Sequence, residues 1–271
     1  MTLRLQLRQP PALRVDARVL APGALAALSL ADVQRLCLPH GREPLPLAEL
    51  FDVERAGGDD DALVLAGDLR RFDGVGAGMA SGSLEVDGAV GDSAGLGMSG
   101  GRLVIRGAAR DLVACSMRGG WLEVHGDIGD FAASALPGDR DGMRGGTLVV
   151  RGRAGARLAD RMRRGTVVVH GDSGDFTASR MVAGTLAIGG RCGAHAGWGM
   201  RRGTLVFAGE APAPPPTFVG MQGDVRVFWQ LLARDLERFG APFAGLARRD
   251  VRRFAGDIAV DGRGEWLVPA T

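Results

Sequence analysis

The sequence contains no lysine and no tyrosine, so arginine supplies all 33 of its basic side chains. With 31 acidic residues the formal net charge is only +2. There is no basic tail and no basic strip studded with aromatic residues, so we expect no nucleic-acid partner. No apolar run is long enough to cross a bilayer, and no basic-then-apolar leader opens the chain. We therefore expect a cytoplasmic protein without a membrane partner.

Cysteine and histidine are also scarce. Three cysteines, Cys37, Cys115 and Cys192, show no CxxC spacing, which argues against a disulfide scaffold and against a zinc or iron–sulfur site. His125 and His170 occupy equivalent places in a repeat, two copies apart. Stacked copies would hold their Cα atoms about 10 Å from each other, too far for one zinc ion with ligands near 2 Å. We expect neither a metal nor a cofactor on this chain.

Glycine, by contrast, is abundant, with 44 residues that recur at a fixed spacing. Segments 83–101, 102–120, 147–165, 166–184 and 185–203 are each 19 residues long and align without gaps. A further copy starts at Trp121 and carries seven extra residues, 135–141, and a looser copy covers 62–82. A repeat of this length is typical of a solenoid whose unit is a single coil.

Positions within the repeat indicate what each residue does. Positions 2 and 4 are apolar, as in Leu103 and Ile105, with an outward residue between them, which is the period of a strand. Position 6 is always glycine, position 13 is always small and position 16 is always methionine. We predict a mainly β protein, a right-handed parallel β-helix of about seven coils and about 34 Å in length. Aliphatic ladders and one methionine ladder would fill its interior.

The repeat divides the chain into three parts. We expect an N-terminal cap over residues 1–61, the β-helix over 62–208, and a C-terminal extension over 209–271. In the cap, residues 1–8 alternate like a strand, Ser29 or Asp32 is placed to cap a short helix, and 38–61 is loop-like. A cap of this kind would hide the first open coil.

The C-terminal extension opens with a proline-rich exit, 210–217, which cannot form ladder hydrogen bonds. Asp224 would then cap a helix, and we expect one of its faces to be buried: Val227, Phe228, Leu231, Leu232 and Leu236. We predict a second helical piece over 246–254 and a closing hairpin that joins 258–260 to 266–268.

One acidic row is the candidate for catalysis. Position 10 is aspartate in four copies, Asp92, Asp111, Asp130 and Asp175, and is interrupted by Ala156 and Ala194. A β-helical carbohydrate-active enzyme would need such carboxylates on a groove. Carboxylates repeated along one edge are more typical of side chains that cap turn N–H groups, and we favour that interpretation.

One basic row is the candidate for binding. Positions 17 and 18 supply six arginines that we call the arginine corner, interrupted at Val182 and Ala183: Arg118, Arg144, Arg163, Arg164, Arg201 and Arg202. Stacked guanidinium groups repel one another, so an acidic group should lie along them. A partner subunit, an anionic cofactor tail and solvent ions all fit.

Three stretches carry a resemblance to a known family. They are the Met-x-x-Gly close of each copy, the insertion LPGDRDGMRGG (136–146) and the ending RRFAGDIAVDGRGEW (252–266). Over residues 60–208 the chain resembles the C subunits of formylmethanofuran dehydrogenases, most of all the C subunits of bacterial formyltransferase/hydrolase complexes. The large subunit of glutamate synthase ends in a related β-helix.

The resemblance implies a role in one-carbon metabolism. Such a complex moves a formyl group from formyl-tetrahydromethanopterin to a methanofuran-type carrier and hydrolyses it to formate during formaldehyde oxidation. This chain would be a non-catalytic structural subunit beside an amidohydrolase-like subunit, a formyltransferase subunit and a molybdo-subunit-like chain. The alternatives are a β-helical carbohydrate-active enzyme and a glutamate-synthase-like β-helix domain.

Overall fold

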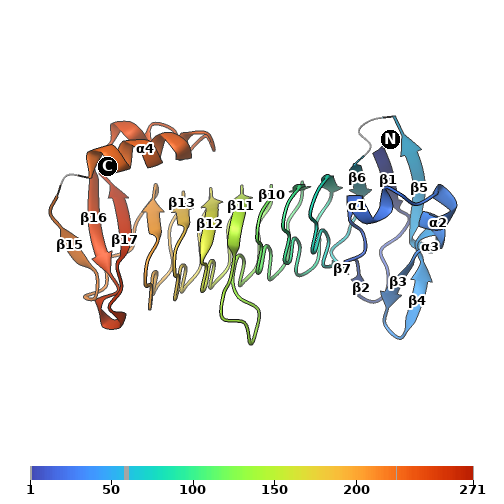
Figure 1. Ribbon diagram of the computed structural model, residues 1–271, viewed down its shortest axis with the longest axis horizontal. Helices are drawn as coiled ribbons and strands as arrows, with labels where there is room; N and C mark the ends of the chain where they lie inside the picture. The colour runs from blue at the N-terminus through green and yellow to red at the C-terminus, as the bar shows by residue number, and fades with distance from the viewer. Residues whose placement is uncertain (1, 58–60, 224, 271) are drawn as a thin grey trace.

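The computed structural model describes residues 2–57, 61–223 and 225–270. The protein is mainly β and forms a long rod (Figure 1). One sheet of 13 strands runs the length of the rod in the order β15-β16-β17-β14-β13-β12-β11-β10-β9-β8-β6-β1-β5. A second sheet at the N-terminal end has the order β4-β3-β2-β7.

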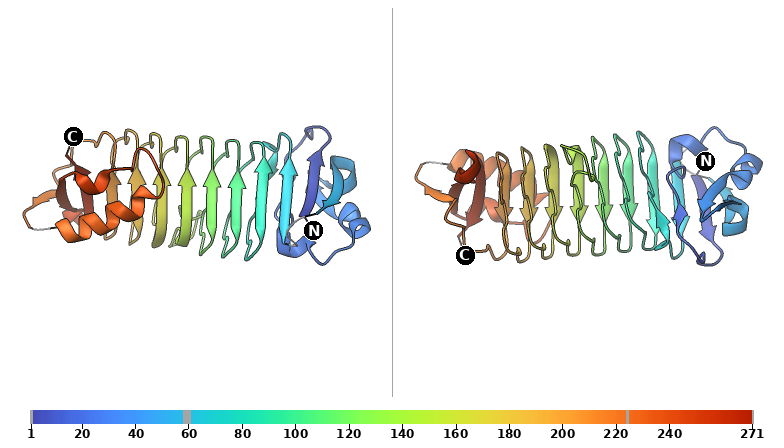
Figure 2. Two further views of the ribbon diagram at one scale, coloured as in Figure 1. Left: turned by 90° about the horizontal axis from the view of Figure 1, so that it is seen from above. Right: turned by 90° about the horizontal axis from the view of Figure 1, so that it is seen from below.

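The repeat supplies the central, parallel strands of the large sheet. These are β6 (Ala62–Ala66), β8 (Ser83–Asp87), β9 (Arg102–Ile105), β10 (Trp121–Val124), β11 (Arg144–Val150), β12 (Arg164–Val169), β13 (Thr185–Ile188) and β14 (Thr204–Phe207). Each strand pairs with the next copy at the same repeat position, so Leu84 lies beside Leu103 and Leu103 beside Leu122. A second row of parallel bridges joins position 8 of successive copies, from Leu69 to Cys192. The chain therefore coils with equivalent positions stacked along the axis, in a β-helix-like arrangement (Figure 2).

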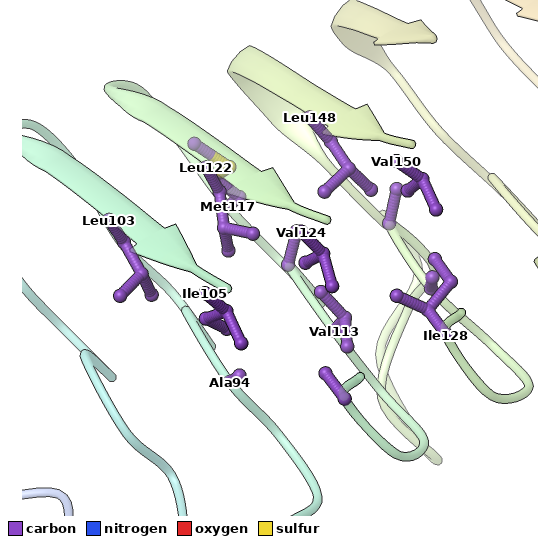
Figure 3. Close-up of a cluster of buried hydrophobic side chains, with 14 of the residues drawn as sticks. Ala94, Leu103, Ile105, Val113, Met117, Leu122, Val124, Ile128, Leu148 and Val150 are labelled. Carbon is purple, nitrogen blue, oxygen red and sulfur yellow. The ribbon is translucent and has the colours of Figure 1, made fainter. Parts of the chain in front are cut away.

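The interior contains the ladders that the repeat predicts. Leu103, Ile105, Leu122 and Val124 point into the coil and are completely buried (Figure 3). Position 16 is also confirmed as core, because six methionines have no exposed surface: Met98, Met117, Met143, Met162, Met181 and Met200. The flexible thioether fills the space between stacked coils that a branched side chain would leave open.

Backbone geometry explains the small residues of the repeat. A Cβ added to Gly88, at position 6, would lie 2.0 Å from the carbonyl oxygen of Gly67 in the preceding coil. Ala114, at position 13, has a φ of 55°, in the left-handed region where larger or branched side chains are strained. Close approach of the backbone therefore requires glycine at position 6, and the left-handed turn favours a small residue at position 13.

The N-terminal region closes one end of the rod. Strand β1 (Thr2–Leu7) lies parallel to β6, and β5 (Phe51–Ala56) lies antiparallel to β1. The small sheet contains β2 (Val15–Asp16), β3 (Cys37–His40), β4 (Glu43–Pro46) and β7 (Phe72–Asp73). Helices α1 (Pro22–Leu25), α2 (Leu30–Arg35) and α3 (Leu47–Leu50) complete the region. The side chain of Ser29 accepts the N–H of Asp32, so the predicted cap of the short helix is confirmed.

The prediction of a loop over 38–61 was wrong for most of its length. Strands β3 and β4 pair with each other, and Leu38, Leu47, Leu50 and Phe51 are buried. Prolines suggested a loop, but β4 is an edge strand, where a missing N–H costs no ladder bond. Residues 58–60 lie outside the described part of the chain.

The C-terminal region closes the other end. It contains β15 (Val219–Met221), α4 (Arg226–Glu237), the short 3-10 helices η1 (Leu246–Arg248) and η2 (Ile258–Val260), and strands β16 (Val251–Gly256) and β17 (Gly264–Pro269). Strand β17 pairs in parallel with β14 and antiparallel with β16. The predicted hairpin exists, but its first strand is β16, and residues 258–260 lie in its loop. The predicted helical piece over 246–254 was wrong beyond Arg248, because backbone pairing with β17 draws residues 251–256 into the sheet.

Helix α4 lies over the outer face of the sheet. Trp229, Ala233 and Leu236 of the helix pack on outward side chains at position 3 of the repeat, which are Val149, Val168, Ala187 and Val206. Where the helix does not cover the sheet, the same position carries a charged residue, Glu85. The prediction of the buried face was therefore wrong for three residues, since Val227, Phe228 and Leu231 are 74%, 44% and 63% exposed. Trp229 and Ala233 take the buried place. Asp224, the predicted cap, lies outside the described residues.

Candidate functional site

The aspartate row belongs to the turns. Each of its carboxylates accepts a backbone N–H from the same position of the next coil: Asp92 from Asp111 (3.3 Å), Asp111 from Asp130 (2.8 Å), Asp130 from Ala156 (2.7 Å) and Asp175 from Ala194 (2.8 Å). The capping interpretation is confirmed. The backbone N–H of the residue at position 10 has no partner in a strand ladder, so it needs another acceptor. The short side chain of the aspartate at position 10 in the preceding coil supplies it.

The two repeat histidines lie in or beside a contact between the rod and the segment that follows α4. Arg151 binds Glu123 through its Nε (2.9 Å) and Nη2 (2.8 Å) and donates from Nη1 to the carbonyl oxygen of Phe239 (3.0 Å). The Nε2 atom of His170 lies 2.9 Å from the same carbonyl oxygen. The indole ring of Trp121 stacks on Phe239. These contacts join three successive coils of the rod to the segment that follows α4. His125 lies at the edge of this cluster, with Nε2 3.6 Å from Glu123.

Opposing effects act on Glu123. Burial would raise the pKa of this carboxyl, but hydrogen bonds from Arg151 and Trp121 and the positive charge of Arg151 outweigh burial and hold the pKa below its usual value. The carboxylate is thus kept ionised as the centre of the network.

The two cysteines of the repeat, Cys115 and Cys192, are not activated thiols, because burial raises the pKa of both. All three cysteines of the chain are free. Burial raises the pKa of Cys115 to about 11, so this thiol stays protonated at neutral pH and is a poor nucleophile. Across residues 2–57, 61–223 and 225–270, no group of three or more His, Cys, Asp or Glu side chains is placed to hold a metal ion. Within the same residues, no helix is both long and apolar enough to cross a membrane.

The structure brings the arginine corner together along one edge of the rod. The backbone N–H groups of Arg118, Arg144, Arg163 and Arg201 each donate to the carbonyl oxygen of the methionine one coil earlier, at 2.6–2.8 Å. Arg144 and Arg164 are direct neighbours across β11 and β12. Arg263 lies in the loop before β17, and its backbone N–H donates to the carbonyl oxygen of Arg201. It extends the row by one residue that sequence reasoning missed.

Part of this charge is already paired. Asp141, in the insertion 135–141, lies 2.9 Å from the Nη1 of Arg163 and 3.7 Å from the Nη2 of Arg144. In the described part of the chain, Arg118, Arg164, Arg201 and Arg202 have no side-chain acid partner. These four guanidinium groups are exposed and are available to an anion.

A groove of about 660 Å³ opens beside the arginine corner. It lies between the insertion and the loop before β17, and its cationic lining is Arg140, Arg161, Arg163, Arg180 and Arg201. Trp198, 53% exposed, also faces it. Arg180 is held by Asp160 through two hydrogen bonds of 2.6 and 2.9 Å. We call this feature the arginine groove.

The other side of the insertion forms a more apolar pocket of about 390 Å³. Leu112, Phe131, Leu136 and Pro137 line it, while Arg161 and Arg180 are shared with the arginine groove. The seven extra residues thus divide one surface into a cationic and an apolar half. Sequence reasoning missed Arg161 and Arg180, although both occupy position 15 of their copies, a regularity that pointed to them.

Comparison with known proteins gives consistent results. The family model "GXGXG motif" matches residues 65–213. Two C subunits are similar in sequence over part of their length. That of the formyltransferase/hydrolase complex Fhc of Methylorubrum extorquens is 42% identical over 90 residues, which are 33% of this chain and 32% of that protein. That of the molybdenum-containing formylmethanofuran dehydrogenase 1 of Methanothermobacter marburgensis is 29% identical over 77 residues, 28% of this chain and 19% of that protein. The chain thus aligns with about a third or less of the length of these curated relatives.

A solved structure extends the similarity to nearly the whole chain. It is the crystal structure of the formyltransferase/hydrolase complex (FhcABCD) from Methylorubrum extorquens in complex with methylofuran. One of its chains superposes with a TM-score of 0.92 at 40% sequence identity and covers 99% of this chain and 100% of that chain. The fold, including both ends of the rod, is therefore shared with that chain.

Proposed function

Because the chain belongs to the family of C subunits of formyltransferase/hydrolase complexes, we propose that it is a non-catalytic structural subunit of such a complex. The complex would convert formyl-tetrahydromethanopterin to formate by way of a methanofuran-type carrier. The observation that carries this proposal is the superposition over the full chain at 40% identity. The aspartate row, which a carbohydrate-active enzyme would need, is engaged in turn hydrogen bonds, so no observation favours that alternative.

The proposal includes the finer architecture and the partners. The rod would be a right-handed parallel β-helix of about seven coils over residues 62–208, with a cap over 1–61 and an extension over 209–271. Its partners would be an amidohydrolase-like subunit, a formyltransferase subunit and a molybdo-subunit-like chain, in the cytoplasm. The rigid stack of coils supports this role, because each coil is bonded to its neighbours along the entire axis.

The arginine corner and the adjoining groove would bind an anion. Four exposed guanidinium groups have no acid partner among the described residues, and one of them, Arg201, also lines the groove. Four further arginines line that groove together with Asp141 and Asp257. A row of cations of this length suits a chain of carboxylates better than a single ion. An acidic surface of a partner subunit and the anionic tail of the carrier both have this chemistry.

Affinity purification of the tagged chain from its native host tests the main proposal. We expect an amidohydrolase-like polypeptide and a formyltransferase to be recovered with it in a fixed ratio, as judged by mass spectrometry. Recovery of the chain alone, or formyl turnover by the isolated chain, would reject the proposal.

A quadruple substitution tests the role of the arginine corner. Arg118→Ala, Arg164→Ala, Arg201→Ala and Arg202→Ala remove the arginines for which the described residues supply no acid partner, and leave the pairs of Asp141 intact. We expect weaker assembly or weaker retention of the anionic carrier, measured in the purified complex. The matched control is Arg153→Ala with Arg191→Ala, two exposed arginines at position 7 of the repeat. Unchanged assembly and unchanged carrier content in the quadruple variant would show that the corner is only a solvated edge.

A further inference from the structure

The arginine groove has an apolar side as well as a cationic one. Trp198 and Val260 are 53% and 43% exposed and line it together with Val182 and Ala259. Tryptophan and arginine are the residues that most often anchor a protein partner. A tail made only of carboxylates would pair with the arginines and leave the apolar side uncovered. The groove therefore fits an occupant that carries both acidic and apolar side chains.

The charge of the lining is not balanced. Five arginines line the groove, but only two acids do, Asp141 and Asp257. Asp141 lies 2.9 Å from Arg163. The carboxylate of Asp257 accepts the backbone N–H groups of Gly199 and Ala259, both at 3.0 Å. A cationic surplus therefore remains, and it is complementary to an acidic occupant.

This surplus is present on both walls of the groove. Asp160 compensates Arg180 through two hydrogen bonds and lies 3.9 Å from Arg161. Arg140 and Arg201 are exposed and have no acid partner among the described residues. Arg140 belongs to the insertion, and Arg201 to the coil that the loop before β17 contacts. Acidic side chains of an occupant can thus reach an unpaired guanidinium group on either wall.

Both walls are held in place by bonds within the chain. Arg161 fixes the insertion, because its Nη1 donates to the carbonyl oxygen of Asp139 at 2.8 Å. The loop before β17 is fixed where the N–H of Asp257 donates to the carbonyl oxygen of Met200 at 3.1 Å. The insertion and this loop project from the same side of the rod (Figure 1). A groove that is formed in advance loses little conformational entropy when it is filled.

From these observations we infer that the arginine groove binds an acidic segment of a partner polypeptide, anchored by an apolar side chain against Trp198 and Val260. Acidic residues on either side of this anchor pair with Arg140 and Arg201. The apolar contact excludes water from the neighbouring ion pairs and so strengthens them. The inference rests on the proposed function and assigns the groove to a partner subunit rather than to the carrier.

Photocross-linking identifies the occupant. Trp198→p-benzoylphenylalanine places a photoreactive aromatic side chain in the groove of the purified complex. We expect a covalent link to a subunit other than this chain, at a segment in which acidic residues outnumber basic ones, located by mass spectrometry. A link to the carrier, to a second copy of this chain or to a segment without an acidic surplus would overturn the inference, and so would the absence of any link.

A pair of substitutions then removes the apolar side of the groove and leaves its charges in place. The full chain, tagged and co-expressed with the other subunits, carries Trp198→Ala with Val260→Ser. We expect at least a tenfold loss of the partner polypeptide that cross-links, while the melting temperature of the isolated chain changes by no more than about 2 °C. The matched control, Phe131→Ala with Val19→Ser, removes an exposed aromatic ring and an exposed valine outside the groove and should leave assembly unchanged.

The outcomes separate this inference from the proposed function. Normal assembly of the Trp198 and Val260 variant would overturn the inference, and so would loss of the carrier from a complex that keeps all its subunits. In both cases partner subunits still co-purify, and the proposed function stands. If the wild-type chain recovers no partner, both fail.

Discussion

The two ends of the rod are closed by the same device with different side chains. At each end a strand from outside the repeat continues the parallel sheet, β1 beside β6 and β17 beside β14, and an antiparallel strand follows. The N-terminal end is filled mainly by leucines, including Leu3, Leu5 and Leu63, with Phe51 and Phe72 in contact behind them. The C-terminal end is closed by a cluster of aromatic rings.

This aromatic cluster consists of Trp266, Phe207 and Phe218, with ring centroids 4.9 and 4.7 Å from that of Trp266. Trp266 is 1% exposed and occupies the place next to Leu205 where a further coil would have its leucine. One large ring system thus covers the open end of the coil that several leucines cover at the N-terminus. The C-terminal end of the rod therefore depends on fewer residues, and one substitution there should disrupt it more easily.

The largest effect is expected from Trp266→Ala. Removal of this side chain opens the end of the coil and should destabilise the chain by about 4 kcal/mol, measured by urea denaturation. The N-terminal counterpart, Phe72→Ala, should cost less, about 3 kcal/mol, because neighbouring leucines close part of the cavity. The control Trp198→Ala removes an exposed indole and should stay within about 0.5 kcal/mol of wild type. A loss at Trp266 no larger than at Trp198 would contradict the comparison.

Arg151→Met should have a smaller effect, about 1–2 kcal/mol. The substitution removes the bonds that join Glu123 to the carbonyl oxygen of Phe239, so it separates the C-terminal extension from the coils while keeping most of the side-chain volume. The matched control is Arg153→Met, whose side chain is 69% exposed and lies 3.5 Å from Asp127. Equal stability of the two variants in thermal unfolding would show that the contact has no structural role.

The dependence of stability on pH should follow from Glu123. Its pKa in the folded chain lies below the ordinary value, so its ionised form stabilises the fold at all pH values above about 4.5. This stabilisation is lost as the pH falls through the lowered pKa of the folded state. Urea unfolding between pH 6 and 3 should therefore show a shallower loss of stability in Glu123→Gln than in wild type. Parallel curves would mean that the carboxylate network contributes nothing.

The smallest effect on the isolated chain is expected at the exposed side of α4. Val227→Gln with Leu231→Gln should change the free energy of unfolding by about 0.5 kcal/mol or less, since neither side chain packs on the rod. The buried side of the same helix gives the contrast, because Leu236→Ala should cost about 2–3 kcal/mol. A large loss in the first variant, measured in urea, would show that the exposed side chains support the fold itself.

Much of this molecule could be predicted from the repeat. The strand at positions 2 to 4, the glycine at position 6 and the methionine at position 16 are all dictated by stacking, because each coil meets only copies of itself. The same logic predicted the turn bonds of Asp111 and Asp130 and the common edge of Arg118 and Arg163. In a repeat that stacks in register, the neighbours of each residue are the residues at the same position of the adjacent copies.

Outside the repeat, the sequence pattern does not indicate which residues will be neighbours in space. Prolines in β4 suggested a loop, and the apolar spacing of Val227 and Leu231 suggested the buried side of a helix. In both cases a contact that is distant in sequence decided the outcome: the pairing of β4 with β3, and the packing of Trp229 on position 3 of the coils.

The sequence by itself determined the coil, its interior and the row of arginines, because the contacts of a stacked repeat are fixed by repeat position alone. Only the tertiary structure decided which side of α4 meets the rod, where the closing hairpin begins, and that the insertion separates a cationic groove from an apolar pocket. These features arise where unique segments meet the repeat. The neighbours of these segments are set by how the chain folds back on itself, and the local spacing of apolar residues carries no information about such distant contacts.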